Sequence, residues 1–302
     1  MIKEKQMKQF EISTDSNCDL YFDEIKQMGI YVGHLNYTLD NGKEFLDLKD
    51  DFKEYSQYVD FYNKLRKGYV AKTSILSLQA HVDLFTEMAK NGVKTALHIA
   101  QSKGLSPTID NANQAIEIVK EKYPDINYVA IQSNTTTMGE GMLVRVATKM
   151  RDEGKSLEET KNYIESIKNH VQHIVMVDDL LYLKRGGRIG AAQAVFGTML
   201  GVKPIIEFNM EGKLEIVRKE RGTRKAFMSI VNEFKSHTLN KDFPYAVIVH
   251  TDNTKDATEL QKLVEEQTGV KPELRIMGPI IGAHVGPNAV ALAFISNEDR
   301  PQ

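Results

Sequence analysis

The chain has 302 residues, which is more than one hydrophobic core usually accommodates, so we expect two domains. Its 39 basic and 41 acidic residues leave a net charge of -2, which disfavours nucleic acid and anionic membranes as partners. The N-terminal segment has no apolar stretch of signal-peptide length, and Cys18, the single cysteine, cannot form an internal disulfide. A cytoplasmic protein is the simplest expectation.

The first half of the chain alternates predicted strands with predicted helices. Apolar runs predict the strands, and amphipathic periodicity predicts the helices. Strand, polar loop and helix in repeated order indicate a mostly parallel sheet with helices on both faces. Such sheets bind ligands beyond the carboxyl ends of their strands. The apolar runs lie at 10–14, 29–39, 95–100 and 127–132, and the helical patterns at 53–66, 78–91, 111–122 and 139–153.

The second half mixes hairpins with helices, which predicts α/β structure with some antiparallel pairing. Ser156 opens a capping box that starts a helix ending near His170. We therefore place the two α/β domains at residues 1–170 and 171–302. The predicted strands are 173–177, 203–208, 213–220, 244–251 and 289–295, and the later helices are 223–236 and 255–268.

Residues 276–297 contain no Lys, Arg, Asp or Glu. Glycine, proline and asparagine interrupt the run and exclude a membrane-spanning helix, so buried backbone is the better interpretation. We expect a turn followed by an interior strand, with His284 at the turn. His284 is then either a core histidine bonded to a carbonyl or a polar group at the closed end of an apolar pocket.

Four loops that follow predicted strands are rich in hydroxyl side chains or glycine. They could bind an oxyanion together, or each Ser and Thr could simply cap the helix that follows. Because four such loops are expected at one edge of the sheet, a single oxyanion site formed by several of them is favoured over four separate helix caps. The loops are 14–20, 72–77, 101–108 and 132–141.

Lys184, Arg185 and Arg188 surround two glycines in the segment 180–190. The spacing of these glycines does not match a dinucleotide or phosphate-binding loop, so the segment is a solvated turn or a contact surface. No motif for a serine nucleophile accompanies His284, and no local spacing of His, Cys and carboxylates predicts a metal site.

Several of these segments together resemble the DegV family. The similarity covers residues 12–294 and includes TDSNCDL, the TSxxS of 73–77, the GLS of 104–106, YLKRGGRIG and GPIIGAHVGPNAVALAF. It implies two α/β domains with a fatty acid between them. The resemblance assigns the fatty-acid carboxylate to a site formed by Thr73, Ser74, Ser102, Gly282 and His284. Lys103 replaces a serine of the family pattern, and if it points inward it adds a charge-assisted bond to the carboxylate.

The resemblance also implies the role of the lipid-binding subunit of bacterial fatty acid kinase, which is not itself an enzyme and needs no cofactor. The protein would shield a long-chain fatty acid and present its carboxylate to a separate kinase subunit. From their charge and position, rather than from the resemblance, we expect Arg185 and Arg188 to help dock that subunit. We expect a monomer when the protein is alone, without stable membrane insertion. The alternatives are a carrier of another amphiphilic lipid and an acyl hydrolase that uses a loop serine with His284.

Overall fold

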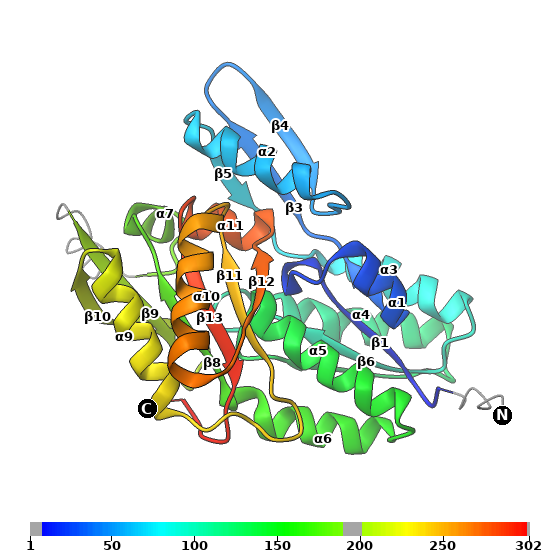
Figure 1. The fold of residues 1–302 in the computed structure, drawn as a ribbon. Coiled ribbons are helices and arrows are strands. Elements are labelled where there is room, and N and C mark those ends of the chain that lie inside the picture. Colours follow the sequence, from blue (N-terminus) through cyan, green and yellow to red (C-terminus); the bar gives the residue numbers. More distant parts are fainter. Residues whose placement is uncertain (1–7, 190–200, 301–302) are drawn as a thin grey trace.

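The computed structural model describes residues 8–189 and 201–300, and the first of its sheets is parallel throughout (Figure 1). This sheet, sheet A, has the strand order β2-β1-β6-β7. The mostly parallel sheet predicted for the first half of the chain is thereby confirmed. Its strands are β1 (Glu11–Asp15), β2 (Tyr31–Gly33), β6 (Thr95–Ala100) and β7 (Asn127–Gln132).

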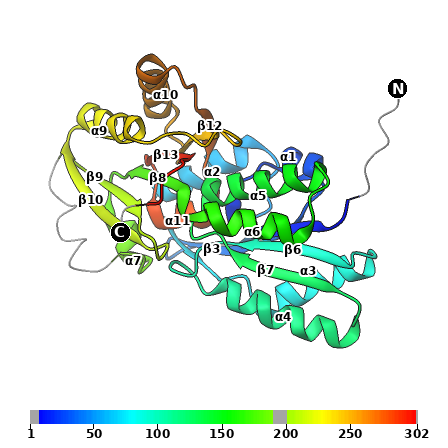
Figure 2. The ribbon, with the colours of Figure 1, turned by 90° about the horizontal axis from the view of Figure 1, so that it is seen from below.

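Helices cover both faces of sheet A (Figure 2). Side chains alternate along β6, so Leu97 and Ile99 pack with α5 and α6, whereas Ala96 lies on the face covered by α3 and α4. Ser156 forms the predicted capping box at the start of α6. The helices of this half are α1 (Phe22–Met28), α3 (Leu78–Lys90), α4 (Thr108–Lys122), α5 (Thr137–Asp152) and α6 (Leu157–Ile167), with 3-10 turns η1 (Ser16–Cys18) and η2 (Lys168–His170).

The second half forms sheet C, with the strand order β10-β9-β8-β13-β11-β12. Only the β11–β12 pair is parallel, so the predicted antiparallel pairing is confirmed. Ile174 and Met176 pack against α9 and α10, and the alternate residues of β8 face the other way. The elements are β8 (Val171–Met176), β9 (Val202–Phe208), β10 (Leu214–Arg221), α9 (Thr223–Ser236), β11 (Ala246–His250), α10 (Thr254–Thr268), β12 (Glu273–Ile276) and β13 (Val290–Ile295).

Helices α5 and α6 connect the two large sheets. One hydrophobic cluster contains Ile99 of sheet A, Met142 of α5, and Val175 and Ala291 of sheet C. The strands of sheet A precede residue 170 and those of sheet C follow it, but the buried core continues across this position. The domain division at residue 170 therefore stays a prediction.

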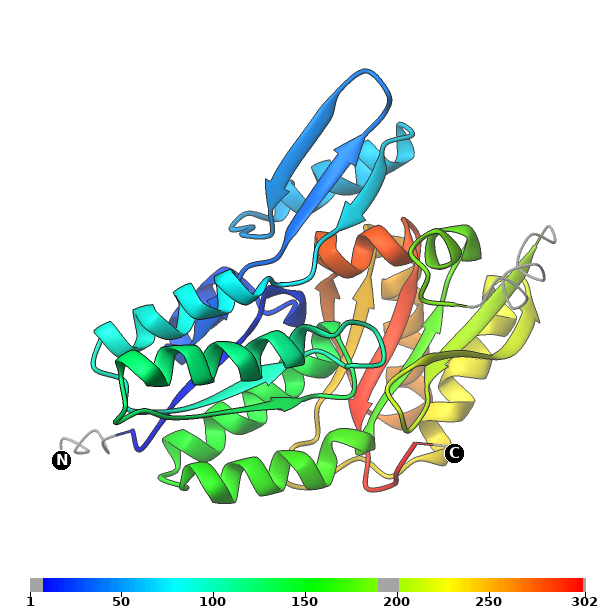
Figure 3. The same cartoon turned by 180° about the vertical axis from the view of Figure 1, so that it is seen from behind.

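A third sheet, sheet B, was not predicted from the sequence. It projects beyond the two larger sheets and is antiparallel, with the order β4-β3-β5 (Figure 3). The apolar run 29–39, which the sequence presents as one segment, is divided between β2 of sheet A and β3 of sheet B. The elements of this part are β3 (Asn36–Asp40), β4 (Phe45–Lys49), α2 (Tyr55–Arg66) and β5 (Val70–Thr73).

The uncharged run contains a short helix, α11 (Pro279–Val285), before strand β13. The predicted interior strand is confirmed, but the predicted turn at His284 is wrong, because His284 lies in the last turn of α11. Pro279 occupies the first helical position, where the missing N–H is tolerated. In the part of the chain that the structure describes, no helix combines the length and the hydropathy needed to cross a membrane.

Candidate ligand-binding cavity

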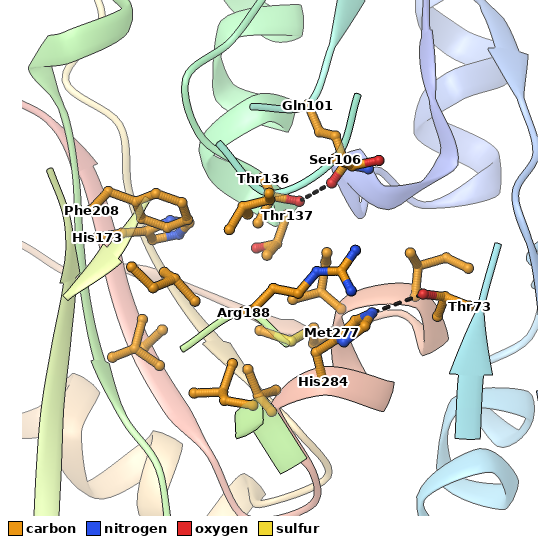
Figure 4. Close-up of a pocket in the computed structure, with 18 of the residues that line it drawn as sticks. Thr73, Gln101, Ser106, Thr136, Thr137, His173, Arg188, Phe208, Met277 and His284 are labelled. Carbon is orange, nitrogen blue, oxygen red and sulfur yellow. Dashed lines mark hydrogen bonds between the residues drawn. The ribbon is translucent and has the colours of Figure 1, made fainter. Parts of the chain in front are cut away.

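An amphipathic cavity lies where the three sheets meet. The carboxyl ends of β6 and β7, the end of β5, one face of sheet C and helix α11 all contribute to its wall. In Figure 4, Thr73 and His284 lie at one side, His173 and Phe208 lie at the other, and Arg188 lies between them. This position agrees with the rule that α/β sheets bind ligands beyond the carboxyl ends of their strands.

Thr73 and His284 form a hydrogen-bonded pair at one end of the cavity. The Oγ1 atom of Thr73 lies 2.8 Å from Nε2 of His284. Ser74, the next residue in the loop, also lines the cavity. Burial and the nearby Arg188 lower the pKa of His284 to about 4, so the imidazole is neutral at pH 7. Its Nδ1 atom is buried and has no hydrogen-bond partner.

Gly186 lies against the ring of His284. A Cβ atom built on Gly186 would lie 2.2 Å from Nδ1 of His284, which is far inside van der Waals contact. Gly186 follows α7 (Leu180–Arg185), and its missing side chain allows the imidazole to occupy this position. The glycine segment and the histidine motif, almost a hundred positions apart in sequence, therefore build one structure.

Arg188 lines the cavity, but Arg185 does not. Burial lowers the pKa of Arg188, and its guanidinium donates a hydrogen bond to the Gly186 carbonyl. Arg185 is exposed, and its guanidinium lies over the ring of Tyr182, 5.4 Å from the centroid. The two arginines that the sequence grouped together thus have different environments.

Loops after β6 and β7 add polar groups to the cavity. Gln101, Ser106, Thr136 and Thr137 are buried lining residues. Thr137 has a φ of 49°, a left-handed conformation that costs a β-branched residue on the order of 1–3 kcal/mol. Thr137 is the first residue of α5, so the strained backbone lies at the point where that helix meets the cavity.

One face of sheet C supplies the apolar wall. Ala291 of β13, Val175 of β8 and Ile206 of β9 are direct neighbours in the strand register. Phe208 and Leu214 extend the wall along the β9–β10 hairpin. Because these side chains point away from α9 and α10, they leave an apolar surface against which a hydrocarbon chain can pack.

His173 was not predicted as a site residue. It lines the cavity and stacks on Phe208, with the ring centroids 5.5 Å apart. Burial is the main cause that lowers its pKa to about 3, and the Arg300 charge adds to the effect. The alternation of β8 could have placed His173 on the same face as Val175, but nothing in the sequence indicated that this face lines a cavity.

Ser102 and Lys103 do not line the cavity, so their predicted contact with the carboxylate stays a prediction. Ser102 is buried, and its hydroxyl donates to the Gly212 carbonyl at 2.8 Å, which fixes the loop against the β9–β10 turn. The Lys103 ammonium lies 2.8 Å from Asp110 at the surface. This pair keeps the charge in water, which is less costly than burying an ammonium group. Ser106 occupies the cavity wall instead.

Gly282 does not line the cavity either, and its predicted role at the site also stays a prediction. A Cβ atom there would lie 2.4 Å from the Tyr62 hydroxyl, which shows that Gly282 lets α11 approach α2 closely. That hydroxyl donates to the Met277 carbonyl at 2.8 Å. The glycine positions α11, and with it His284, rather than contacting the cavity directly.

A family model described as "uncharacterised protein, DegV family" matches residues 9–297. The chain belongs to the DegV family. A DegV domain-containing protein of Clostridium perfringens is 34% identical over 296 residues, covering 98% of this chain and 100% of that protein. Another from Lactococcus lactis is 31% identical and covers 96% and 99% of the two chains. The family predicted from the motifs is confirmed.

Solved DegV structures share the fold. A DegV lipid-binding protein of Thermotoga maritima has a TM-score of 0.81 at 24% identity, with 97% of this chain and all of that chain covered. A fatty-acid-binding DegV protein of Thermus thermophilus has a TM-score of 0.80 at 25% identity, with 95% and 99% covered. One from Streptococcus agalactiae has a TM-score of 0.78 at 26% identity, with 97% and 100% covered. The predicted α/β fold of the DegV type is confirmed.

Proposed function

We propose that this protein binds a long-chain fatty acid in the cavity and presents its carboxylate to a separate kinase subunit. The observation that carries the proposal is the Thr73–His284 pair at one end of a cavity whose opposite wall is apolar except for His173. Fatty-acid binding by the DegV proteins of Thermus thermophilus and Streptococcus agalactiae supports the same ligand class.

The tail would supply most of the affinity. Burying roughly 16 methylenes at about 0.8 kcal/mol each gives on the order of 13 kcal/mol before the association and ordering terms are subtracted. The row formed by Ala291, Val175 and Ile206 offers a flat apolar surface for this contact. It has no hydrogen-bonding group that an acyl chain would leave unpaired.

The carboxylate needs hydrogen-bond donors, because burial of an unpaired charge is costly. If Thr73 donates to Nε2 of His284, the ring proton is on Nδ1, which is buried beside Gly186 and does not face the ligand. If Nε2 donates to Thr73, the threonine hydroxyl keeps its hydrogen for the carboxylate. The second tautomer therefore suits binding of a carboxylate, and Arg188 adds a positive charge to the same cavity.

Hydrolysis by a serine and histidine is less well supported by this arrangement. His284 bonds to a threonine, and its Nδ1 atom faces no carboxylate among the described residues. A nucleophilic serine requires a base that a third group orients. The pair therefore suits binding of a carboxylate better than activation of a hydroxyl for attack.

Presentation to a kinase requires the carboxylate to lie near a surface that a partner can reach. Arg188 lines the cavity, and the exposed Arg185 lies three positions earlier in the same segment. This segment thus joins the predicted headgroup region to the outside of the molecule. Positive charge there would attract a partner that carries nucleotide phosphates.

The test is mass spectrometry of lipids released from the purified protein by denaturation, followed by a kinase assay with a bacterial fatty acid kinase subunit and ATP. We expect about one fatty acid per chain and acyl-phosphate formation that depends on this protein. A different stoichiometric lipid would support the alternative carrier, and an acyl adduct on a serine would support the hydrolase. Fatty-acid binding without turnover would remove the kinase role alone.

A further inference from the structure

Three buried side chains outside the cavity converge on one point. They are Asp15 at the end of β1, His98 on β6 and His81 on α3, each 1% exposed or less. The Oδ1 atom of Asp15 lies 3.6 Å from Nε2 of His98 and 3.9 Å from Nε2 of His81. The three facing atoms lie within 4.8 Å of one another, and none has a hydrogen-bond partner.

The pleat of sheet A explains how the cluster forms. Ser13 and His98 are directly opposite each other on the neighbouring strands β1 and β6. Asp15 is two residues after Ser13, so it points to the same face, which is the face that α3 covers. His81 lies on that helix. Because the three residues are 66 and 17 positions apart along the chain, no local spacing indicates the cluster.

Hydrogen bonds on the outer side of each ring orient the histidines. Nδ1 of His81 lies 3.1 Å from the Ser77 carbonyl, which can only accept, so the ring proton is on Nδ1 and Nε2 carries a lone pair. Nδ1 of His98 lies 3.0 Å from the Ser13 hydroxyl, which can accept in the same way. Such outer partners are typical of metal-binding histidines.

Without a cation, this arrangement is electrostatically unfavourable. A carboxylate oxygen of Asp15 faces the lone pair of His81 at 3.9 Å, and neither atom has a hydrogen-bond partner. Among the ion pairs of residues 8–189 and 201–300, Asp15 has only these two histidines as partners. A positive charge between the three atoms would satisfy all of them at once.

We propose that Asp15, His81 and His98 form a binding site for a divalent transition metal of the Zn²⁺ type. Two imidazoles and one carboxylate are ligands that Zn²⁺ accepts. Zinc ligands at about 2.0–2.2 Å from the metal lie roughly 3.3 Å from one another. The two separations from Asp15, 3.6 and 3.9 Å, are close to this value, and the two histidine nitrogens lie within 4.8 Å of each other, so the side chains would have to move together by up to about 1.5 Å.

A bound metal would stabilise the loops that form the polar end of the cavity, without contacting the lipid. Ser77, the partner of His81, caps α3 and ends the loop that carries Ser74 into the cavity. The other oxygen of Asp15 accepts a hydrogen bond from the Gln101 backbone at 3.4 Å, and Gln101 lines the cavity. Metal would therefore tie α3 and the loop after β6 to sheet A.

The test uses the full chain without a polyhistidine tag, stripped with a chelator and titrated with Co²⁺ as a spectroscopic probe, then with Zn²⁺ in competition. We expect one equivalent to bind and the unfolding temperature to rise. Asp15→Asn and His98→Gln should weaken binding more than about 100-fold, because loss of an outer partner alone costs about 10–100-fold. Ser13→Ala should show that smaller loss.

His237→Gln is the matched control, since His237 pairs with Glu233 and Glu298 at a separate place and should leave the affinity unchanged. Circular dichroism checks that each variant folds. The proposal is overturned if the wild-type chain binds no stoichiometric Co²⁺ or Zn²⁺. It is also overturned if folded Asp15→Asn and His98→Gln bind the metal as tightly as the wild type. The wild-type titration decides the question even if a variant does not fold.

Discussion

The imidazole of His284 and the hydroxyl of Thr73 are 2.8 Å apart although 211 positions separate the two residues in the chain. Thr73 ends β5 of the projecting sheet B, and His284 lies in the last turn of helix α11. The pair therefore forms only when sheet B, α11 and the rest of the fold are assembled. This explains why a ligand-binding group can be built from two residues that are individually unremarkable in sequence.

Replacing His284 by Gln should weaken binding of a fatty acid by about 10- to 100-fold, because a hydrogen bond to a charged group is worth about 1.5–3 kcal/mol. Displacement of a fluorescent fatty acid measures the change. The loss should be smaller for the methyl ester, whose neutral carbonyl accepts a weaker bond. His170→Gln, away from the cavity, is the control. An equal loss for acid and ester would show that His284 acts through packing.

Gly186→Ala should displace the imidazole of His284 without removing any polar group. The new methyl would lie 2.2 Å from Nδ1, so the ring must move and the bond to Thr73 must lengthen. We expect at least about a tenfold loss of fatty-acid affinity in the same displacement assay. Lys184→Ala, at an exposed position on α7, should bind normally. Normal binding by Gly186→Ala would mean that the position of His284 does not matter.

Arg188→Ala and Arg185→Ala should separate binding from docking. Arg188 lines the cavity, so its loss should reduce affinity for the ionised fatty acid. Arg185 is exposed, so its loss should leave lipid affinity intact and lower the turnover by the kinase subunit. Equilibrium binding and acyl-phosphate formation are measured for both variants. Identical effects of the two substitutions on both measurements would contradict the distinction.

Ala291→Leu should shorten the acyl chains that the cavity accepts. Ala291 lies beside Val175 at one end of the apolar row, and a larger side chain there would occupy the path of the tail. Overpacking of this kind costs about 1–3 kcal/mol for a ligand that fills the site. A series of saturated fatty acids of increasing length gives the profile. An unchanged profile would show that the tail does not pass over β13.

Asp50 should make the protein less stable as the pH rises. Burial raises the pKa of this carboxyl to about 7 in the folded chain, above its ordinary value of 3.8. Below pH 3.8 it is protonated in both states, and stability falls as the pH rises from there through 7, by at most about 1.4 kcal/mol per pH unit.

The check on Asp50 is urea unfolding at pH 5 and pH 8. Asp50→Asn should lose less stability between these two values than the wild-type protein does. Asp47→Asn, which changes an exposed carboxylate on β4, should keep the wild-type difference. If Asp50→Asn and the wild type show the same difference, the carboxyl of Asp50 is ionised to the same extent in both folded and unfolded chains.

Much of the fold could be predicted because hydrophobic periodicity reports burial directly. The runs that became β6, β7, β8 and β11 are short, apolar and bounded by polar loops. Sheet B was missed because β4 has only five residues with no fully buried side chain, and because the run 29–39, which contains most of β3, is continuous with β2 in the sequence. The helix at His284 was missed because Pro279 and Gly282 predict a turn locally, whereas tertiary contacts with Tyr62 favour α11.

The site could be predicted only in part for a related reason. Thr73, Ser74 and His284 line the cavity as the family pattern implies. Ser102 and Lys103 are in the loop after β6, which also reaches the cavity, but their side chains point elsewhere. A motif specifies which loop approaches the site. Which side chain of that loop points inward depends on its backbone turn and on partners such as Gly212 and Asp110, which lie elsewhere in the sequence.

The most direct test of fatty-acid binding in this orientation is a crystal structure of the complex with a fatty acid that carries bromine at the end of its tail. We expect density in the cavity, with the carboxylate within hydrogen-bond distance of Thr73 or His284. The anomalous bromine peak should then lie over the apolar face of sheet C. A ligand outside the cavity, or a reversed one with its carboxylate beside His173, would contradict this expectation.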